Sequence, residues 1–544
     1  MSGLTRLVVF TVVCSGLSLL PAVASAQHDQ HAGTPPDDVG AAHVKFATSC
    51  APTVHAAFNR GVALLHSFWF PQAVTTFQSI LKTDPDCAMA HWGIAISRWG
   101  NPFAGLKGAP AVEATRAAVT DARKTGTPTP RERAYIEAVA TLTTDTTPGS
   151  HAARIAAYES SMAALTKAYP DDREARMFYA LAINQTASPS DKTYTKQLQA
   201  AAILEPLFKD MPDHPGLAHY LIHSYDTPAL ADRGLVAARR YASLAPAVPH
   251  ALHMPSHTFT RIGLWKESID TNLKSADAAR RDKGVGEELH ALDYLVYAHL
   301  QIAQDTAAKD VLDHALALAV ADGGTAAGAA GAGAYALAAI PARYALERGA
   351  WNDAAALTVR PATTPHTEAI THFARALGAA RRGQPADAAP DLARLAELRD
   401  KLQASQDVYW SGQVDIQRRV AAAWVAYAEG HRDEGIAALS AAADAEDATD
   451  KSAVSPGPLA PARELLGFML MDAGRHRDAL GAFEATMKKE PNRFRGTYGA
   501  ARAAELAGDR TTATTYYRRL LDVATAADTE RQEIVAARAF LGRK

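Results

Sequence analysis

The chain has 544 residues, of which 48% are hydrophobic, 21% charged and 7% aromatic, with 56 basic against 58 acidic residues. A formal net charge of −2 excludes a generally basic nucleic-acid-binding protein, and three cysteines are too few for a multi-cysteine zinc fold or a disulfide scaffold. The length suggests several domains or one long repeating structure, and the low aromatic content suggests closely packed helices.

Residues 1–26 have the pattern of a secretory signal peptide. Arg6 supplies a positive start, residues 7–20 form an apolar stretch too short to cross a bilayer comfortably, and residues 24–26 give a small-x-small cleavage pattern. We therefore expect an exported protein, which is periplasmic in a bacterium with two membranes, or secreted. An uncleaved membrane anchor is the alternative. Residues 27–48 are expected to form a polar, disordered arm.

Two cysteines remain after the predicted cleavage, Cys50 and Cys87. The repeats described next place them at the same end of one antiparallel helical hairpin. In an oxidising compartment this placement favours a disulfide between them. Two unpaired buried thiols are the alternative.

One spacing of residues recurs at both ends of the chain. A small residue is followed after 12 residues by alanine, after 4 more by an aromatic residue and after 8 more by proline. Small residues let two helices approach closely, the large residue packs between neighbouring units, and proline ends the second helix. The pattern occurs at Gly61, Ala73, Phe77 and Pro85, at Gly467, Ala479, Phe483 and Pro491, and, without the proline, at Ala501, Ala513 and Tyr517.

These spacings resemble the 34-residue tetratricopeptide repeat (TPR) over most of residues 53–526. We therefore predict an all-α fold, a TPR-like right-handed α-solenoid of about eleven to twelve helical hairpins. The expected parts are an N-terminal array with a histidine-rich groove over 49–322, a Gly/Ala-rich hinge over 323–334 and a C-terminal TPR array over 335–544.

A histidine pattern in the middle of the chain keeps the same period. His219 and His223 are four residues apart, as are His253 and His257, so each pair lies on one face of a helix. Both positions of the second pair follow those of the first by 34 residues. One repeat length carries a residue to the same place on the next unit, so the four imidazoles are expected to face one groove.

Two i, i+4 histidine pairs on adjacent helices can converge on one ion of the zinc, copper or iron type. Asp226 lies near one helical turn beyond His223, and the next unit offers His290 and Asp293 to the same groove. Either aspartate is expected to ligate the ion or to orient an imidazole. Hydrogen bonding of the histidines to peptides or tyrosines, without metal, is the alternative. His66 is expected to pack in the core.

The segments HYLIHSYD, HMPSHTFTRIGLW and PDCAMAHWGIA resemble segments of exported bacterial TPR proteins. The resemblance implies a concave surface for a peptide or protein partner, and it does not imply catalysis. We expect an exported scaffold whose groove carries a transition-metal site and binds a peptide, protein or small ligand. We expect it to bind no nucleic acid and to have no membrane span in the mature chain. A metal-dependent hydrolase or oxidase using the same histidines, and a metal-free interaction module, are the alternatives.

Overall fold

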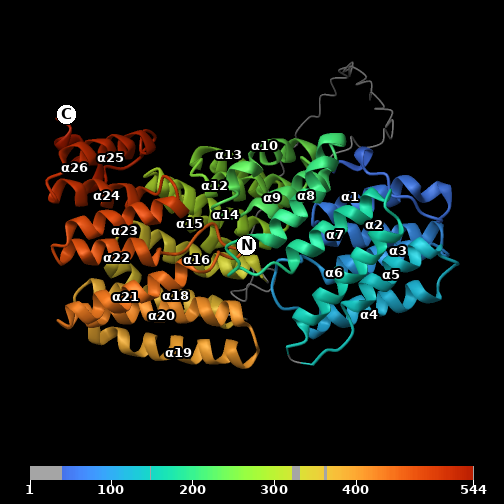
Figure 1. Cartoon of the computed structure of the whole chain (residues 1–544), viewed down its shortest axis with the longest axis horizontal. Helices are drawn as coiled ribbons and strands as arrows, with labels where there is room; N and C mark the ends of the chain where they lie inside the picture. Colours follow the sequence, from blue (N-terminus) through green and yellow to red (C-terminus); the bar gives the residue numbers. More distant parts are fainter. Residues whose placement is uncertain (1–38, 148, 322–330, 361–363, 543–544) are drawn as a thin grey trace, which may run out of the picture. The chain divides into compact units, whose positions relative to one another are not determined.

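Helices arranged as consecutive antiparallel hairpins make up the protein, seen in a computed structural model (Figure 1). The structure describes residues 39–147, 149–321, 331–360 and 364–542. Within these ranges the regular elements are α-helices and short 3₁₀ helices, without a β-strand. The predicted all-helical solenoid of hairpins is therefore confirmed. None of the described helices is both long and apolar enough to cross a membrane.

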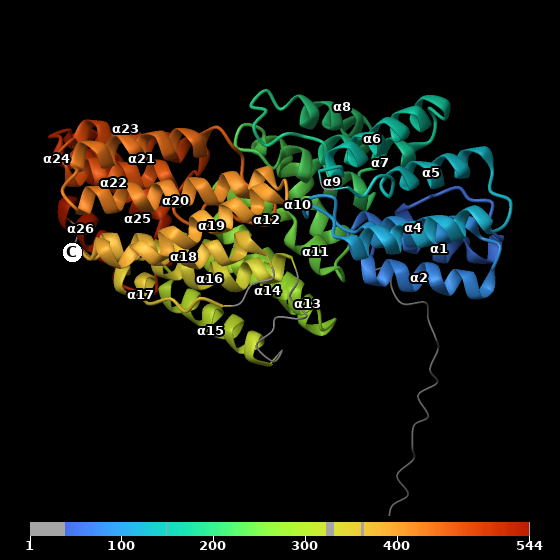
Figure 2. The same cartoon turned by 90° about the horizontal axis from the view of Figure 1, so that it is seen from below.

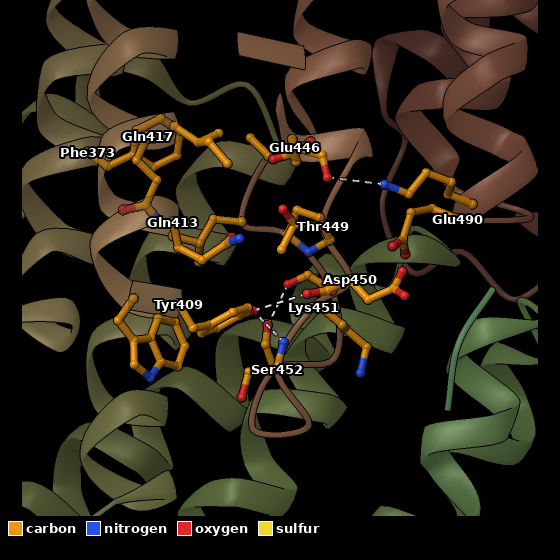
Figure 3. Close-up of a pocket in the computed structure, with 18 of the residues that line it drawn as sticks. Phe373, Tyr409, Gln413, Gln417, Glu446, Thr449, Asp450, Lys451, Ser452 and Glu490 are labelled. Atoms are coloured by element: carbon orange, nitrogen blue, oxygen red, sulfur yellow. Dashed lines mark hydrogen bonds between the residues drawn. The ribbon is translucent and has the colours of Figure 1, made fainter. Parts of the chain in front are cut away.

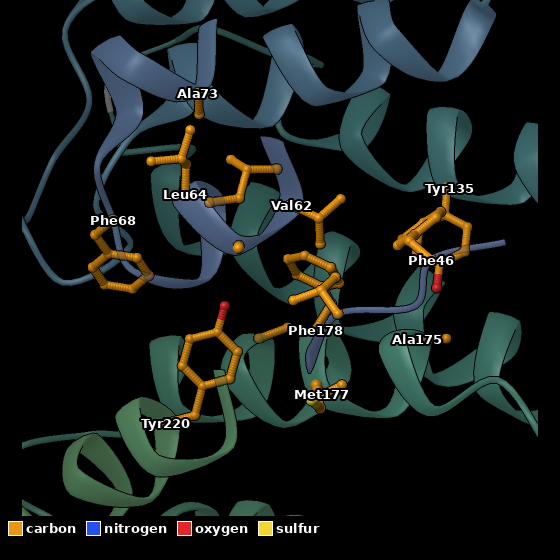
Figure 4. Packing of buried hydrophobic residues seen from close by; sticks show 14 of the residues in the cluster. Phe46, Val62, Leu64, Phe68, Ala73, Tyr135, Ala175, Met177, Phe178 and Tyr220 are labelled. Atoms are coloured by element: carbon orange, nitrogen blue, oxygen red, sulfur yellow. The ribbon is translucent and has the colours of Figure 1, made fainter. Parts of the chain in front are cut away.

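The helices up to residue 261 surround one hydrophobic core, which extends from Val39 to Phe259. Figure 4 shows part of it, with the ring of Phe46 beside Tyr135 at a centroid distance of 5.2 Å. Each helix packs against its neighbours in the chain. The helices are α1 His55–His66, α2 Phe70–Thr83, α3 Ala88–Trp99, α4 Ala109–Lys124, α5 Pro130–Thr141, α6 His151–Ala168, α7 Arg173–Gln185, α8 Thr195–Asp210, α9 Pro215–Tyr225, α10 Leu235–Leu244, α11 Pro249–His253 and α12 Pro255–Arg261.

The remaining helices contribute to three further core clusters, the first of which begins at Trp265. Consecutive helices again lie side by side, as both views of the molecule show (Figures 1 and 2). They are α13 Trp265–Arg281, α14 Val285–Gln301, α15 Asp305–Ala321, α16 Ala332–Glu347, α17 Trp351–Ala355, α18 Pro365–Arg381, α19 Ala389–Ala404, α20 Val408–Ala428, α21 Arg432–Asp447, α22 Ala462–Asp472, α23 His476–Lys489, α24 Phe494–Leu506, α25 Arg510–Val523 and α26 Gln532–Phe540. Short 3₁₀ helices occur at Ala41–His43, Pro52–Val54, Ala231–Gly234 and Pro385–Ala388.

The segment before α1 packs on the first core. Val39, Val44 and Phe46 are buried, so the disordered arm expected over 27–48 is wrong for residues 39–48. Its apolar residues are few but find a hydrophobic surface beside α3 and α5, where the ring of Phe46 also lies 5.2 Å from that of Trp92. The remainder of the arm, residues 27–38, lies outside the described residues, as does the signal peptide expected at 1–26.

Cys50 and Cys87 form a disulfide in the structure, with their Cα atoms 4.8 Å apart. Glu132, which caps the start of α5 together with Thr129, also accepts hydrogen bonds from the backbone and hydroxyl of Ser49. The bridge closes a loop of 37 residues around the first hairpin. Such a cross-link stabilises the folded chain mainly by restricting the unfolded one.

The hinge expected over 323–334 stays a prediction, because residues 322–330 lie outside the described residues. The helices on either side pack together: α14 and α15 precede this segment, α16 follows it, and α16 contacts both.

An aromatic ring held between two glycines sets the distance between successive hairpins. The ring of Phe77 on α2 lies between Gly61 and Gly93, where a methyl group in place of either glycine hydrogen would lie 2.7 or 2.5 Å from it. Phe483 lies in the same way between Gly467 and Gly499. The packing role that the repeat spacing predicted for these residues is therefore confirmed.

We predict that Gly499→Ala lowers the free energy of unfolding by about 1–3 kcal/mol, because the new methyl group overlaps the ring of Phe483 and the helices must separate. Gly481→Ala is the matched control. Gly481 lies on the exposed side of α23 with open space around its Cα, so alanine should raise the stability by up to about 1 kcal/mol. Urea unfolding followed by circular dichroism measures both. Equal effects would show that the ring does not set the spacing.

Candidate metal centre

Six histidines from four helices lie close together in two groups of three. Within each group, one nitrogen of every imidazole lies within 4.8 Å of the others. The first group consists of His219 and His223 on α9 and His250 on α11, and the second consists of His253 at the end of α11, His257 on α12 and His290 on α14.

Prolines position the helices that carry these groups. Pro215, Pro249 and Pro255 each begin a helix, where the missing N–H is not needed. Pro255 also interrupts the helix between His253 and His257, so that α11 and α12 are joined at Met254. The two histidines still face each other across this junction.

In the first group, the Nε2 atoms converge. Nε2 of His219 lies 3.1 Å from Nε2 of His223 and 3.3 Å from Nε2 of His250. Nδ1 of His219 lies 2.5 Å from the backbone carbonyl of His66. A carbonyl can only accept a hydrogen bond, so Nδ1 carries the proton and Nε2 of the neutral ring presents its lone pair to the group.

In the second group, both close nitrogens present lone pairs. Nε2 of His253 lies 3.1 Å from Nε2 of His257. His257 donates from Nδ1 to the carboxylate of Asp226 at 2.8 Å, and His253 donates from Nδ1 to Oδ1 of Asn272 at 2.7 Å. The side-chain nitrogen of Asn272 donates a hydrogen bond to the backbone carbonyl of Ser268. The side-chain oxygen of Asn272 therefore faces His253.

His290 completes the second group. Its ring centroid lies 4.3 Å from that of His253. Its Nδ1 atom is buried and has no hydrogen-bond partner among the described residues. An unpaired polar atom in a buried position is costly to the fold, and here it belongs to a good metal ligand.

The two groups are adjacent. The ring centroids of His223 and His257 lie 6.0 Å apart, and those of His250 and His253 lie 6.2 Å apart. Within each group the central ring, His219 or His253, lies closer to its two partners, at 4.3 to 5.1 Å.

Aromatic rings enclose the first group. Phe68 lies 4.4 Å from His219 and 5.4 Å from His250, and Phe103 stacks on His223 at 4.1 Å. Phe68 has a φ of 55°, which is uncommon for a residue other than glycine. This backbone conformation brings its ring against three of the histidines.

Burial lowers the pKa of all six imidazoles. Neighbouring imidazoles lower the pKa of five of them further, since a second positive charge nearby is unfavourable. For His257 the carboxylate of Asp226 opposes the effect of burial. The rings are therefore held neutral, which is the form of histidine that binds metal ions.

Asp226 contacts a histidine of the second group through its hydrogen bond with Nδ1 of His257, and its expected role at a metal site stays a prediction. Besides His257, it accepts a hydrogen bond from Nε of Arg261 at 2.8 Å, and Nζ of Lys451 lies 3.5 Å away. Burial opposes its ionisation, but Lys451 and Arg261 hold the pKa of Asp226 well below its usual range. Both carboxylate oxygens of Asp226 already have hydrogen-bond partners, and neither oxygen is among the clustered ligand atoms of the two histidine groups.

Asp293 does not join either group, although it was expected in the same groove. Its carboxylate pairs instead with Nε of Arg343 at 2.7 Å, and both side chains are fully buried. Arg343 also donates to the hydroxyl of Ser455 and to the carbonyl of Gly457. The buried arginine needs a negative partner, which explains why Asp293 faces it.

His66 is buried, as expected, and takes part in a separate polar cluster. Its Nε2 lies 2.8 Å from the carboxylate of Glu174, whose other oxygen lies 3.1 Å from His214. Nδ1 of His66 bonds to the hydroxyl of Tyr220. The His66 carbonyl is the group that fixes His219, so this cluster supports the site from outside.

Two features of the site differ from the sequence analysis. His250 was not among the predicted residues, because the position one repeat earlier is Gly216 and the 34-residue rule does not mark it. The histidines also do not line an open groove: only His223 is partly exposed, and the others are buried. Tyr294 on α14, within hydrogen-bonding distance of Ala453 and Ser455 at 3.3 Å, helps the segment after α21 to cover them.

A polar pocket is lined by residues of α20 and of the segment after α21 (Figure 3). It shares Arg261 and Lys451 with the surroundings of Asp226. The hydroxyl of Tyr409 accepts from the backbone N–H of Ser452 at 2.6 Å and holds the loop that carries Lys451. Further lining residues include Trp410, Gln413, Glu446 and Glu490.

No protein-family model and no curated protein matches the chain. Among solved structures, it is similar to yeast Tom70, with 11% identity over 90% of this chain and 88% of that one and a TM-score of 0.27. It is also similar to the TPR domain of P58(IPK), with 13% identity over 67% and 98% of the chains and a TM-score of 0.21. A monomeric mutant of IFIT1 with Gppp-AAAA gives 12% identity over 80% and 90%, with a TM-score of 0.32. At these scores the similarities carry no argument about function.

We predict that Asp293→Ala lowers the free energy of unfolding by about 3–5 kcal/mol, because it leaves the charge of Arg343 buried and unpaired. The control is Asp313→Ala, which removes an exposed partner of Lys309 on α15 and should cost less than about 1 kcal/mol. Urea denaturation of both variants tests the assignment. A small effect of Asp293→Ala would mean that the carboxylate is not needed by Arg343.

Proposed function

We propose that the protein is an exported helical-repeat scaffold that binds a transition metal at its buried histidines. The observation that supports this most directly is the pair His253 and His257. Their Nδ1 protons are committed to Asn272 and Asp226, so their Nε2 lone pairs face each other at 3.1 Å. The hydroxyl of Tyr294 lies 3.4 Å from Nε2 of His257, which is too long for a strong hydrogen bond. Two lone pairs 3.1 Å apart repel unless a positive charge lies between them.

The distance between these nitrogens favours an ion over the other occupants. Two nitrogens about 2.0–2.1 Å from one ion in tetrahedral geometry lie roughly 3.3–3.4 Å apart. A water molecule donating to both would hold them more than about 4 Å apart, since each hydrogen bond is near 2.8 Å. A shared proton would create a buried cation, and Asp226 is already paired with Arg261 and Lys451.

The donor set limits the kind of metal. Imidazole nitrogens suit zinc, copper, iron and nickel, whereas magnesium and calcium prefer oxygen ligands. The proposal therefore covers zinc, copper or iron, as the sequence suggested. Asp226 and Asn272 would fix the orientation of the ligands, as partners of metal-bound histidines usually do.

A metal-dependent enzyme is the second candidate, and the polar pocket favours it. A substrate in this pocket would contact Arg261 and Lys451 beside the second histidine group. The peptide or protein partner implied by the TPR resemblance, and export to the periplasm, belong to the same proposal and rest on the sequence.

We predict that the purified wild-type protein retains a transition metal after dialysis, and that His223→Ala and His257→Ala each retain less of it. Each variant removes one ligand from a different group. His431→Ala is the matched control, because the His431 side chain is 65% exposed, lies in the turn between α20 and α21 and belongs to neither histidine group. Elemental analysis measures the bound metal, and circular dichroism verifies that the helices persist. Wild-type protein that holds no metal after supplementation would exclude the proposal and favour the metal-free module.

A change outside the ligands separates metal binding from simple packing. We expect Asn272→Leu, which keeps the size of the side chain but removes the acceptor for Nδ1 of His253, to weaken metal binding about 10–100-fold. Competition with a chelator measures the affinity. An unchanged affinity would mean that the orientation of His253 does not matter, and that this histidine is not a ligand.

A further inference from the structure

We infer that the six histidines hold two metal ions in adjacent three-imidazole sites, and that the pair is copper. This inference rests on the proposed function and specifies it. The first site consists of His219, His223 and His250, and the second consists of His253, His257 and His290.

The geometry favours two ions over one. In each group one central ring, His219 or His253, lies 4.3 to 5.1 Å from its two partners, whereas the rings of different groups that lie side by side, such as His223 and His257, are 6.0 Å or more apart. In each group a ligand atom of all three rings lies within 4.8 Å of the other two. Each group is thus a complete set of three donors with its own point of convergence.

Each site is built in the same way from the repeat. An i, i+4 pair supplies two ligands, and the first helix of the next hairpin supplies the third. For the pair on α9 the third ligand is His250 on α11, and for the pair around Met254 it is His290 on α14. Replacing either His250 or His290 should therefore disable the site to which that histidine belongs and leave the other site able to bind an ion.

The charges around the sites favour copper. All six donors are neutral imidazoles, and the nearest carboxylate, Asp226, is paired with Arg261 and Lys451. A second carboxylate, that of Glu287, lies 4.0 Å from Nδ1 of His250, and neither it nor Asp226 belongs to the two groups of ligand atoms. Repulsion between two adjacent divalent ions is about four times that between two monovalent ions, and the donor set itself contains no anion to offset it. Copper is the transition metal of this series that also binds as a monovalent ion, and its divalent form has the highest affinity for nitrogen sites.

Access to the first site is partly open. His223 is its partly exposed member, and the half-buried ring of Phe103 lies over it at 4.1 Å. An ion can reach the first site by displacement of this ring. All three histidines of the second site are buried. We therefore infer that an ion reaches the second site through the first.

Copper stoichiometry tests the inference. The wild type, His250→Ala, His290→Ala and the exposed control His431→Ala are loaded with copper(I) under anaerobic conditions, desalted and analysed for copper per chain. We expect two equivalents in the wild type and in the control, and one in each of the other variants. If an alanine variant loses its helical signal, His250→Gln or His290→Gln replaces it, since glutamine keeps the volume of the side chain.

Paramagnetic resonance of the oxidised samples gives a second readout. Two adjacent copper(II) ions in the wild type should show spin coupling, whereas His290→Ala and His250→Ala should each show the signal of one isolated ion. One equivalent in the wild type that both variants abolish would overturn the two-ion inference and leave the proposed metal binding intact. Two equivalents retained in both variants would also overturn it. Tight retention of zinc but not copper would overturn the choice of copper, and no metal of any kind would remove the proposed function itself.

Discussion

The contact of one aromatic ring with glycines on the two neighbouring helices determines how closely successive hairpins stack. Phe77 and Phe483 show it at the two ends of the chain. In the histidine-bearing part, Ala237, Tyr241 and Pro249 repeat the spacings of 4 and 8 residues, so Tyr241 takes the position of those phenylalanines. Its ring stacks on His219 at 5.1 Å. The residue at the spacing position of the repeat there contacts a proposed ligand in place of the glycines.

Constant spacing has a consequence for any residue that follows the 34-residue period. Equivalent positions on adjacent units come close together, as His223 and His257 do. Hydrophobic residues at such positions would simply extend the core. Histidines there require compensation, because buried polar groups must be satisfied. The carbonyl of His66, Asn272 and Asp226 supply it on the Nδ1 side of His219, His253 and His257, whose Nε2 atoms face the neighbouring imidazoles.

The sequence predicted those parts of the molecule that depend on periodic spacing. The helical hairpins, the glycine and phenylalanine contacts and the proximity of the two histidine pairs all follow from a fixed offset along the chain. His250 was missed because it has no counterpart one repeat earlier, and its place in the site depends on the helix break at Pro255. Asp293 was misplaced for a related reason: its partner Arg343 lies 50 residues away on α16, and no periodic pattern marks that contact.

The expectation of an open groove failed through contacts between distant parts of the chain. Tyr294, for example, lies within hydrogen-bonding distance of the backbone of Ala453, 159 residues along the sequence. The spacing of hairpins predicts which faces adjoin within the stack, but it does not predict which later loop covers a face. The segment around Val39 and Phe46 shows the same limit near the N-terminus. Its composition is mostly polar, but the core buries its few apolar residues.

The loop that covers the histidines also connects them to the polar pocket. Lys451 lines the pocket and lies 3.5 Å from Asp226, which in turn accepts the Nδ1 proton of His257. An anionic group in the pocket would compete with Asp226 for Lys451 and leave more negative charge on the carboxylate facing His257. A stronger acceptor at Nδ1 makes Nε2 a better donor to a metal ion. By thermodynamic linkage, a bound ion would then strengthen the binding of that anion to the same extent. A chain of three side chains therefore suffices to couple the pocket to the proposed metal centre without any movement of the helices.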